Sequence, residues 1–181
     1  MPYCIAFLRA VNVGGRIVKM DALKAQFEAL GLAQVSTFIA SGNVIFESKA
    51  RDLGALERKI EARLNSAFGF EIHSFVRSAA EVAAIAAHSA FDAADVAAAN
   101  TCVVGFLASA PDATALKTIA AFNTDVDHFH VHGRELYWLS RQKQSESTFS
   151  NAKFEKALRM RSTFRGIGTL HKLVAKYPSG A

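Results

Sequence analysis

The alternation of apolar and polar positions divides the first half of the chain into short strands and amphipathic helices. The predicted strands are short runs rich in apolar residues, and in the predicted helices apolar residues recur three or four positions apart. The strands cover residues 3–9, 34–40, 44–47 and 71–77, and the helices cover residues 21–30 and 52–68. This order, β-α-β-β-α-β, is that of a ferredoxin-like unit.

An alanine-rich segment follows the first unit. Residues 78–88 are predicted to form a helix that begins with a capping box, in which Ser78 and Glu81 satisfy the free amides of the first turn. From the end of this helix to about residue 99 we expect a loop.

A second set of elements begins at residue 101. The strands cover residues 101–108, 126–132 and 135–139, the last two joined as a hairpin around Gly133 and Arg134, and the helices cover residues 111–122, 151–161 and 169–175. The order β-α-β-β-α repeats the topology of the first unit, with weak residue identity. We therefore predict an α+β fold of two tandem ferredoxin-like (split β-α-β) subdomains with mainly antiparallel sheets, over residues 1–88 and 99–181.

Alternation within the two hairpins predicts which side chains share a face of each sheet. In the second hairpin Phe129 and Val131 face the core, and three histidines occupy the opposite face. In the first hairpin both faces carry large apolar groups: Ile39 and Phe46 on one, Phe38 and Ile45 on the other. Because a ferredoxin-like sheet has helices on one face only, the second face must be covered by the other unit, a partner chain or a ligand. Packing between the units is our first expectation.

Two glycine-bearing segments of the first unit carry the best candidate for a binding site. One lies at residues 10–19, after the first strand, and the other is the turn at residues 41–43. The first two strands of such a unit run parallel with the third between them, so both segments lie at the same end of the sheet. The predicted ligand-binding residues are Arg9, Asn12, Gly14, Gly15, Arg16, Lys19, Ser41, Gly42 and Asn43.

These residue types suit an anionic, phosphorylated or nucleotide-like small molecule. Glycines let backbone N–H groups approach a ligand closely, and the N-terminus of the following helix favours negative charge. The basic side chains add charge. The segment is neither a Walker motif nor a dinucleotide-binding fingerprint. The alternative is structural: Asn12 and Asn43 hold the two segments together, and the glycines only serve the turns.

No catalytic residue can be assigned. Cys4 and Cys102 lie within predicted strands, and no serine occupies a Gly-x-Ser-x-Gly elbow. An enzyme acting on a phosphorylated substrate, with Arg9 and Asn12 orienting it, is kept as an alternative function. No cofactor is predicted.

The charge of the chain is concentrated in its last quarter. The formal net charge is +5, and residues 134–181 hold five Lys and five Arg against three Glu. A basic half favours anionic partners, so a nucleic-acid-binding module is a second alternative function. Against it, the first sheet lacks the basic and aromatic platform of an RNA-recognition motif. The other interpretation is that these basic residues form the solvent-exposed face of a helix.

Three histidines at every second position could suggest a metal site. His128, His130 and His132 lie on one face of a strand, and Glu135 lies opposite His132 if the turn has two residues. Along a strand the three imidazoles span about 13 Å, too far for all of them to bind one ion. We therefore predict no metal site and interpret this face as an exposed polar face of a hairpin.

Composition favours a cytoplasmic protein that does not associate with membranes. Apolar residues make up 51% and charged residues 20% of the 181 residues. The apolar runs are far shorter than the ~20 residues of a membrane span, and the first residues lack the pattern of a signal peptide. Cys4 and Cys102 are expected to be core thiols rather than a disulfide pair. The pattern does not determine the oligomeric state.

The two glycine-bearing segments also resemble those of a bacterial family known as domain of unknown function 1697. The opening Leu8-Arg9-Ala10-Val11-Asn12-Val13-Gly14-Gly15, the later Phe38-Ile39-Ala40-Ser41-Gly42-Asn43-Val44 and the junction Phe75-Val76-Arg77-Ser78 carry the likeness. Near the C-terminus, Arg165-Gly166-Ile167-Gly168-Thr169-Leu170 departs from the Asn- and Trp-containing stretch of many members. The resemblance implies two ferredoxin-like subdomains and no established activity.

Overall fold

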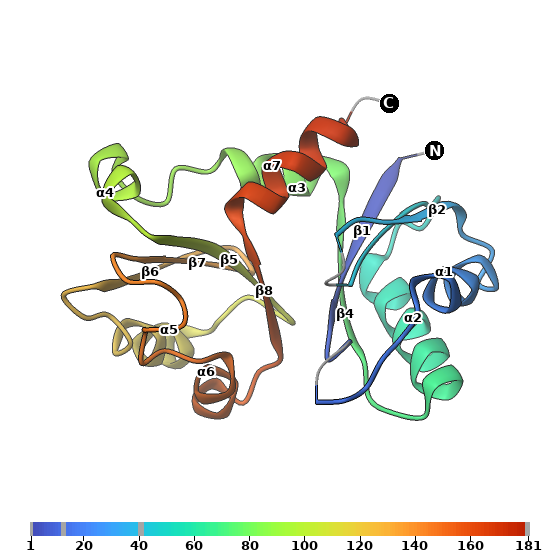
Figure 1. Ribbon diagram of the computed structural model, residues 1–181, viewed down its shortest axis with the longest axis horizontal. Coiled ribbons are helices and arrows are strands. Elements are labelled where there is room, and N and C mark those ends of the chain that lie inside the picture. Colours follow the sequence, from blue (N-terminus) through green and yellow to red (C-terminus); the bar gives the residue numbers. More distant parts are fainter. Residues whose placement is uncertain (1, 12–13, 40–41, 180–181) are drawn as a thin grey trace. The chain divides into compact units, whose positions relative to one another are not determined.

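The computed structural model describes residues 2–11, 14–39 and 42–179, and the chain folds as two compact units (Figure 1). The first unit consists of residues 1–84 and 172–181, and the second of residues 85–171. The division falls inside two helices, α3 (Ala79–Ala87) and α7 (Ile167–Lys176).

The first unit contains a four-stranded sheet with the helices α1 and α2, beside its parts of α3 and α7. Its elements are β1 (Tyr3–Arg9), α1 (Met20–Glu28), β2 (Ala33–Thr37), β3 (Asn43–Glu47), α2 (Leu53–Phe68) and β4 (His73–Ser78). The strand order is β2-β3-β1-β4, and every neighbouring pair is antiparallel. Figure 1 shows α1 and α2 on the same face of this sheet. The predicted ferredoxin-like order is confirmed.

The core of the first unit lies between the sheet and these helices. α1 contributes Leu23 and Phe27, and α2 contributes a stripe that includes Ile60. The rings of Phe27 and Phe46 lie 5.5 Å apart. Full burial of each such side chain contributes about 1.5–3 kcal/mol. This packing fixes both helices against one face of the sheet. It thereby fixes the positions of the segments that connect the helices to the strands.

The second unit repeats this topology in full. Its elements are α4 (Ala93–Ala98), β5 (Thr101–Leu107), α5 (Ala113–Ala120), β6 (Asp127–His132), β7 (Glu135–Ser140), α6 (Asn151–Leu158) and β8 (Ser162–Gly166). The strand order is β6-β7-β5-β8, again with antiparallel neighbours. The chain is therefore an α+β protein with two antiparallel sheets, as predicted.

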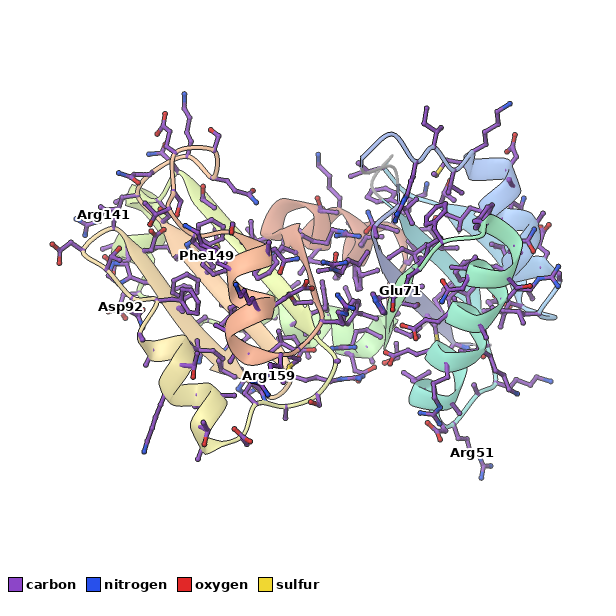
Figure 2. The ribbon with its side chains drawn as sticks, turned by 90° about the horizontal axis from the view of Figure 1, so that it is seen from below. Arg51, Glu71, Asp92, Arg141, Phe149 and Arg159 are labelled. Carbon is purple, nitrogen blue, oxygen red and sulfur yellow. The ribbon has the colours of Figure 1, made fainter. Side chains whose placement is uncertain are left out.

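Aromatic side chains fill the core of the second unit. The ring of Phe149, labelled in Figure 2, lies 4.6–5.8 Å from the ring centroids of five others. These are Phe122, Phe129, Trp138, Phe154 and Phe164. The predicted inward direction of Phe129 is confirmed, because it packs against the cluster of buried residues.

Several predicted boundaries are wrong, and β8 is the most consequential error. The predicted β-α-β-β-α order of the second unit is incomplete, because residues 162–166 pair with β5 as an edge strand. Phe164 is the only large apolar residue in β8, so the segment lacks a clear alternating signal. α4 occupies part of the predicted loop over residues 88–99, and α6 ends at Leu158 instead of continuing to residue 161.

The first hairpin also differs from its prediction. β2 ends at Thr37, so Ile39 lies in the turn with φ +56° and is 50% exposed. The prediction that Ile39 shares a strand face with Phe46 is therefore wrong. Phe46 belongs to the core on the helix side, and Ile45 on the opposite side is fully buried. What covers that second face stays a prediction.

The C-terminal segment differs from the predicted division as well. Residues 172–181, expected in the second subdomain, belong to the first unit. Tyr177 provides the reason: its hydroxyl lies 3.0 Å from that of Ser36, and its ring meets Tyr3 edge-on at 5.4 Å. Within the part of the chain that the structure describes, no helix has the length and apolar character needed to cross a membrane.

The capping box at the start of α3 is formed as predicted. The amide of Ser78 donates to the carboxylate of Glu81 at 2.7 Å, and the amide of Glu81 donates to the Ser78 hydroxyl at 3.2 Å. The two side chains thereby satisfy backbone amides at both sides of the cap.

Candidate functional site

Three connecting segments of the first unit meet at one end of its sheet. β1 ends there, β3 and β4 begin there, and the register pairs Phe7 with Asn43 and Arg9 with His73. The segments are the β1–α1 connection, the β2–β3 turn and the α2–β4 turn. We call this end of the sheet the glycine edge.

Contacts between Gly42 and the end of β1 hold two of these segments together. The amide of Leu8 donates to the carbonyl oxygen of Gly42 at 2.8 Å. A Cβ atom on Gly42 would lie 3.2 Å from that of Leu8 and 3.6 Å from that of Val11. The predicted proximity of the two glycine-bearing segments is therefore observed at these described residues. Asn12 and Ser41, both predicted to bind ligand, lie outside the described residues.

Asn43 is part of the frame of the turn. Its side chain is fully buried, and its amide nitrogen donates to the carbonyl oxygen of Phe38 at 2.9 Å. The amide of Phe38 in turn donates to the carbonyl oxygen of Asn43 at 3.0 Å. The structural interpretation has Asn12 and Asn43 hold the two segments together, and Asn12 lies outside the described residues. The bonds between Asn43 and Phe38 close the hairpin. Asn43 and Gly42 are both buried, so they support the glycine edge from its interior and are not part of its exposed surface.

The exposed part of the glycine edge is the β1–α1 connection. Gly14 and Gly15 are exposed, with φ values of +65° and +80°, and no described atom lies within 4 Å of a Cβ built on either. The guanidinium of Arg16 lies 5.0 Å from the centre of the Phe70 ring, which belongs to the α2–β4 turn. Lys19, also exposed, is the last residue before α1.

The N-terminus of α1 opens onto this connection. Lys19 holds the N-cap position in extended conformation, and no side chain among the described residues caps it. The first amides of a helix lack partners inside the helix and carry partial positive charge. A free helix N-terminus of this kind favours an anion.

The charges at the glycine edge are mixed in sign. Arg9 is the last residue of β1, and strand alternation places it on the sheet face opposite the helices, with Phe7. The α2–β4 turn contributes Glu71, whose carboxylate lies 3.3 Å from His73. Arg16 and Lys19 are therefore the cations best placed beside Gly14 and Gly15.

A family model described as "Protein of unknown function (DUF1697)" matches residues 1–137. The chain belongs to the DUF1697 family. The predicted resemblance is therefore confirmed, and the matched region contains every residue of the glycine edge.

The fold of this DUF1697 protein is also found in a solved structure. A conserved bacterial protein, SP0830 from Streptococcus pneumoniae, has a TM-score of 0.77 and 20% sequence identity, over 98% of both chains. At this identity the likeness shows the shared fold. A search of curated proteins gave no match.

The pKa of both thiols of this DUF1697 protein is raised. Both cysteines are free. Burial, and secondarily the charge of Glu81, raises the pKa of Cys4 to about 11, and burial also raises the pKa of Cys102. Nucleophilic cysteines need the opposite shift, because the thiolate is the reactive form.

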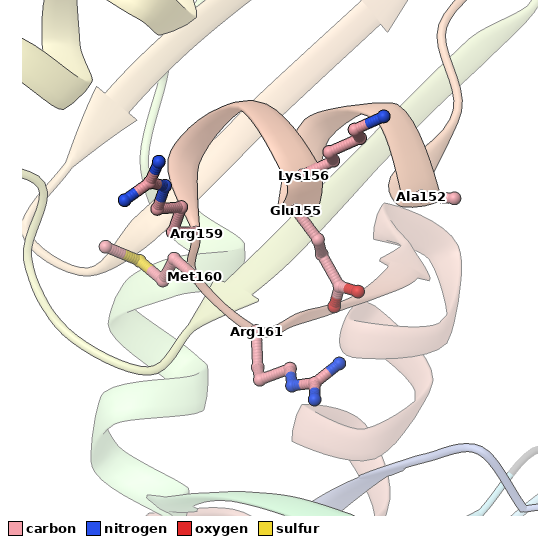
Figure 3. A pocket seen from close by; sticks show the side chains of 6 residues that line it. All are labelled: Ala152, Glu155, Lys156, Arg159, Met160 and Arg161. Atoms are coloured by element: carbon pink, nitrogen blue, oxygen red, sulfur yellow. The ribbon is translucent and has the colours of Figure 1, made fainter.

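Three of the basic C-terminal residues gather at the end of α6. Lys156, Arg159 and Arg161 line a pocket of about 440 Å³ at the end of α6 (Figure 3). Figure 3 shows Arg159 extending away from Glu155 and Arg161. Arg165 is buried and donates to the Thr163 hydroxyl at 2.9 Å, and its burial lowers the pKa of the guanidinium to about 10.

The predicted histidine face exists, and the structure adds a fourth histidine to it. His128, His130 and His132 pair with Leu139, Tyr137 and Glu135, as predicted. The additional residue is His88, from the segment after α3, whose ring stacks on that of His132 with 4.1 Å between centroids. The sequence offers no signal for this neighbour, because only the folded topology brings residue 88 to β6.

Proposed function

We propose that this DUF1697 protein is a cytoplasmic binding protein that holds an anionic, phosphorylated or nucleotide-like small molecule at the glycine edge. The observation that carries the proposal is the group formed by exposed Gly14 and Gly15, the uncapped start of α1, and the cations Arg16 and Lys19. The cytoplasmic location is the expectation from the sequence.

Each part of this group has a role in anion binding. Glycines at positive φ turn the backbone sharply and leave their N–H groups accessible to phosphate oxygens. A guanidinium offers five N–H donors in a plane that matches phosphate geometry, and an ammonium adds a point charge. The Phe70 ring beneath Arg16 limits the freedom of that side chain before a ligand arrives.

Two exposed apolar side chains support a ligand with an apolar portion. Ile17 is 83% exposed in the β1–α1 connection, and Ile39 is 50% exposed in the β2–β3 turn. Ile39 also has φ +56°, an unfavourable conformation for a β-branched residue. Strained residues of this kind gather at ligand sites, where function compensates for the strain. A nucleotide combines a phosphate with a flat apolar base.

The proposal is tested by ligand-dependent thermal stabilisation. Pyrophosphate, ADP and glucose 6-phosphate are added separately, and at least one is expected to raise the Tm of the wild type. Arg16→Glu and Lys19→Glu are expected to lose most of that rise, because each reverses a charge beside the phosphate site.

Arg51 provides a matched control for these variants. It is an exposed arginine just before α2, at the opposite end of the sheet, and is labelled in Figure 2. Arg51→Glu changes the net charge equally and is expected to keep the rise in Tm. If Arg16→Glu and Lys19→Glu keep the full rise as well, the glycine edge is not the site.

A second candidate function is nucleic-acid binding by the second unit. The pocket at the end of α6 is lined by Lys156, Arg159 and Arg161, which favours contacts to phosphates. Binding of mixed oligonucleotides that weakens steeply with salt, and that Arg159→Glu reduces, would support it. Binding that is absent or independent of salt would exclude it.

A third candidate is an enzyme that would bind a phosphorylated substrate at the same glycine edge. Arg9 and Asn12 were expected to orient the substrate, and Asn12 lies outside the described residues. Turnover of the stabilising ligand in the thermal assay would be the first sign of such a reaction.

A further inference from the structure

The second unit contains a cluster of histidines from two distant segments. His88 follows α3, and His130 and His132 lie on β6. The Nε2 atoms of His88 and His130 are 3.5 Å apart. The ring of His88 is stacked on that of His132, with 4.1 Å between centroids and 20° between planes.

Several contacts fix the position of His88. The ring of Tyr137, on β7, lies 5.1 Å from the imidazole of His88. The Tyr137 hydroxyl donates to the carbonyl oxygen of Ile85 at 3.0 Å, and the amide of His88 donates to the same oxygen at 3.4 Å. The end of α3 is thereby tied to the sheet, and His88 faces β6 without depending on a ligand.

The spacing of the two nitrogens suits a shared metal ion. With metal–nitrogen bonds of about 2.0–2.1 Å, a separation of 3.5 Å gives an N–metal–N angle of roughly 115–120°. This angle is close to that of a tetrahedral site. Neutral imidazole nitrogen is a preferred ligand of Zn²⁺, Ni²⁺ and Cu²⁺ and a poor ligand of Mg²⁺ and Ca²⁺.

We propose that His88 and His130 form a two-histidine site for a divalent transition-metal ion, with Zn²⁺ as the reference ion. The site lies wholly within the second unit and is independent of the anion site at the glycine edge. Two protein ligands leave the remaining coordination positions to water or to a small ligand.

The described residues add no third protein ligand to the pair, because no group of three or more His, Cys, Asp and Glu side chains among them has the arrangement of a metal site. A pocket of about 620 Å³ lies beside His88 and is lined in part by Ser89, Asp92 and His171, but not by His130. His132, stacked on His88, is a positioning residue for that ring.

Isothermal titration with ZnCl₂ at pH 7.5, after removal of metal with EDTA, tests the site. The wild type is expected to bind one equivalent. His88→Ala and His130→Ala are each expected to weaken binding at least tenfold, because each removes one of the two ligands. Excess Mg²⁺ is expected not to compete.

His128→Ala is the matched control, because His128 lies on the same strand face as His130, two residues away. It is expected to bind Zn²⁺ within twofold of the wild type. Far-UV circular dichroism and the fluorescence of the chain's single tryptophan, Trp138, check that each variant is folded.

Three outcomes overturn the site. These are no Zn²⁺ binding by the wild type, unchanged binding by both His88→Ala and His130→Ala, and an equal loss in His128→Ala. As a second readout, Zn²⁺ is expected to raise the Tm of the wild type and of His128→Ala, and to leave the Tm of His88→Ala unchanged. A rise in His88→Ala equal to that of the wild type also overturns it.

Discussion

The amide of Leu8 donates a hydrogen bond to the carbonyl oxygen of Gly42 at 2.8 Å. This bond joins the end of β1 to the turn that precedes β3. It holds the two glycine-bearing segments at one end of the sheet, where the exposed Gly14 and Gly15 follow. The proposed anion site depends on this junction, so the junction is the first feature to perturb.

Replacement of Gly42 by alanine is expected to destabilise the first unit by about 2–3 kcal/mol. Gly42 has φ +77°, and a Cβ atom there would lie 3.2 Å from the Cβ of Leu8 in a buried turn. The change combines backbone strain with overpacking. Urea denaturation followed by far-UV circular dichroism measures the loss.

Gly15→Ala separates strain from overpacking. Gly15 has φ +80°, and no described atom lies within 4 Å of a Cβ built there. Its replacement is therefore expected to cost only about 1–2 kcal/mol, from the backbone alone. Equal losses in Gly42→Ala and Gly15→Ala would show that the contact with Leu8 contributes nothing.

Phe70 is expected to support anion binding without contacting the anion. Its ring lies beneath the Arg16 guanidinium at 5.0 Å. Phe70→Leu keeps an apolar side chain and removes the cation–π attraction, which is worth about 0.5–1 kcal/mol at exposed sites. If pyrophosphate is bound at the glycine edge, its affinity is expected to fall about two- to fivefold in this variant.

Phe68→Leu is the comparison for Phe70→Leu, since Phe68 ends α2, Phe70 follows in the next turn, and their rings are 6.4 Å apart. Both side chains pack against the core, so either replacement is expected to lower stability, but Phe68→Leu is expected to leave pyrophosphate affinity unchanged because the contact with Arg16 is made by Phe70. Calorimetric titration distinguishes the two. A matching loss of affinity in both variants would argue against a role of the ring in holding Arg16.

The sequence predicted elements whose own residues carry a periodic pattern. The stripe of α2 and the histidines of β6 repeat at helical and strand spacing, and both appear where expected. β8 was missed because Phe164 is its only large apolar residue, and an edge strand is defined by its partner. The order of apolar and polar residues within a segment does not show that it pairs with a strand far away in the sequence.

The candidate site was predictable to a similar degree. Strand order alone places Gly14 and Gly42 at one end of the sheet, because β3 lies between β1 and β2. The burial of Asn43 and the contact between Arg16 and Phe70 depend on side-chain packing in the turns. His88 lies far from β6 in the chain, and its contact with that strand follows only from the path of the chain after α3.

Gly105→Ala is expected to destabilise the second unit by about 1–3 kcal/mol. A Cβ atom on Gly105 would lie 2.6 Å from Cε1 of Phe164. That ring is packed between Phe149 and Phe154, at 5.8 and 6.0 Å, so it has little room to move. Fluorescence of Trp138, which stacks on Phe129 in the same core, follows the transition.

A smaller side chain at position 164 is expected to rescue this variant. The loss of stability in the double variant Gly105→Ala/Phe164→Leu should be smaller than the sum of the two single losses by at least about 0.5 kcal/mol. Gly168→Ala serves as the control without a clash: this residue of α7 has no described atom within 4 Å of a Cβ, and its replacement is expected to be neutral or slightly stabilising. Simple additivity in the double variant would rule out the clash as the cause.

Stability is expected to fall between pH 9 and pH 11 because of Cys4. The ordinary pKa of the thiol is 9.0, and burial, with a smaller effect of Glu81, raises the pKa to about 11 in the folded protein. Below pH 9 both states hold the proton, so the thiol contributes no slope. Between the two values the unfolded chain releases the proton and the folded chain keeps it, which favours unfolding by up to ~1.4 kcal/mol per pH unit.

Cys4→Ala isolates this effect, because alanine has no proton to release. Burial raises the pKa of Tyr137 and Cys102 as well, so the wild type and Cys102→Ala are measured beside it. Urea denaturation at pH 7, 9, 10 and 11 gives the free energy of unfolding for each. Cys4→Ala is expected to start lower at pH 7, from the lost buried sulfur, and to approach the wild type as the pH rises. A difference between the two that stays constant from pH 9 to pH 11 would show that Cys4 titrates normally in the folded protein.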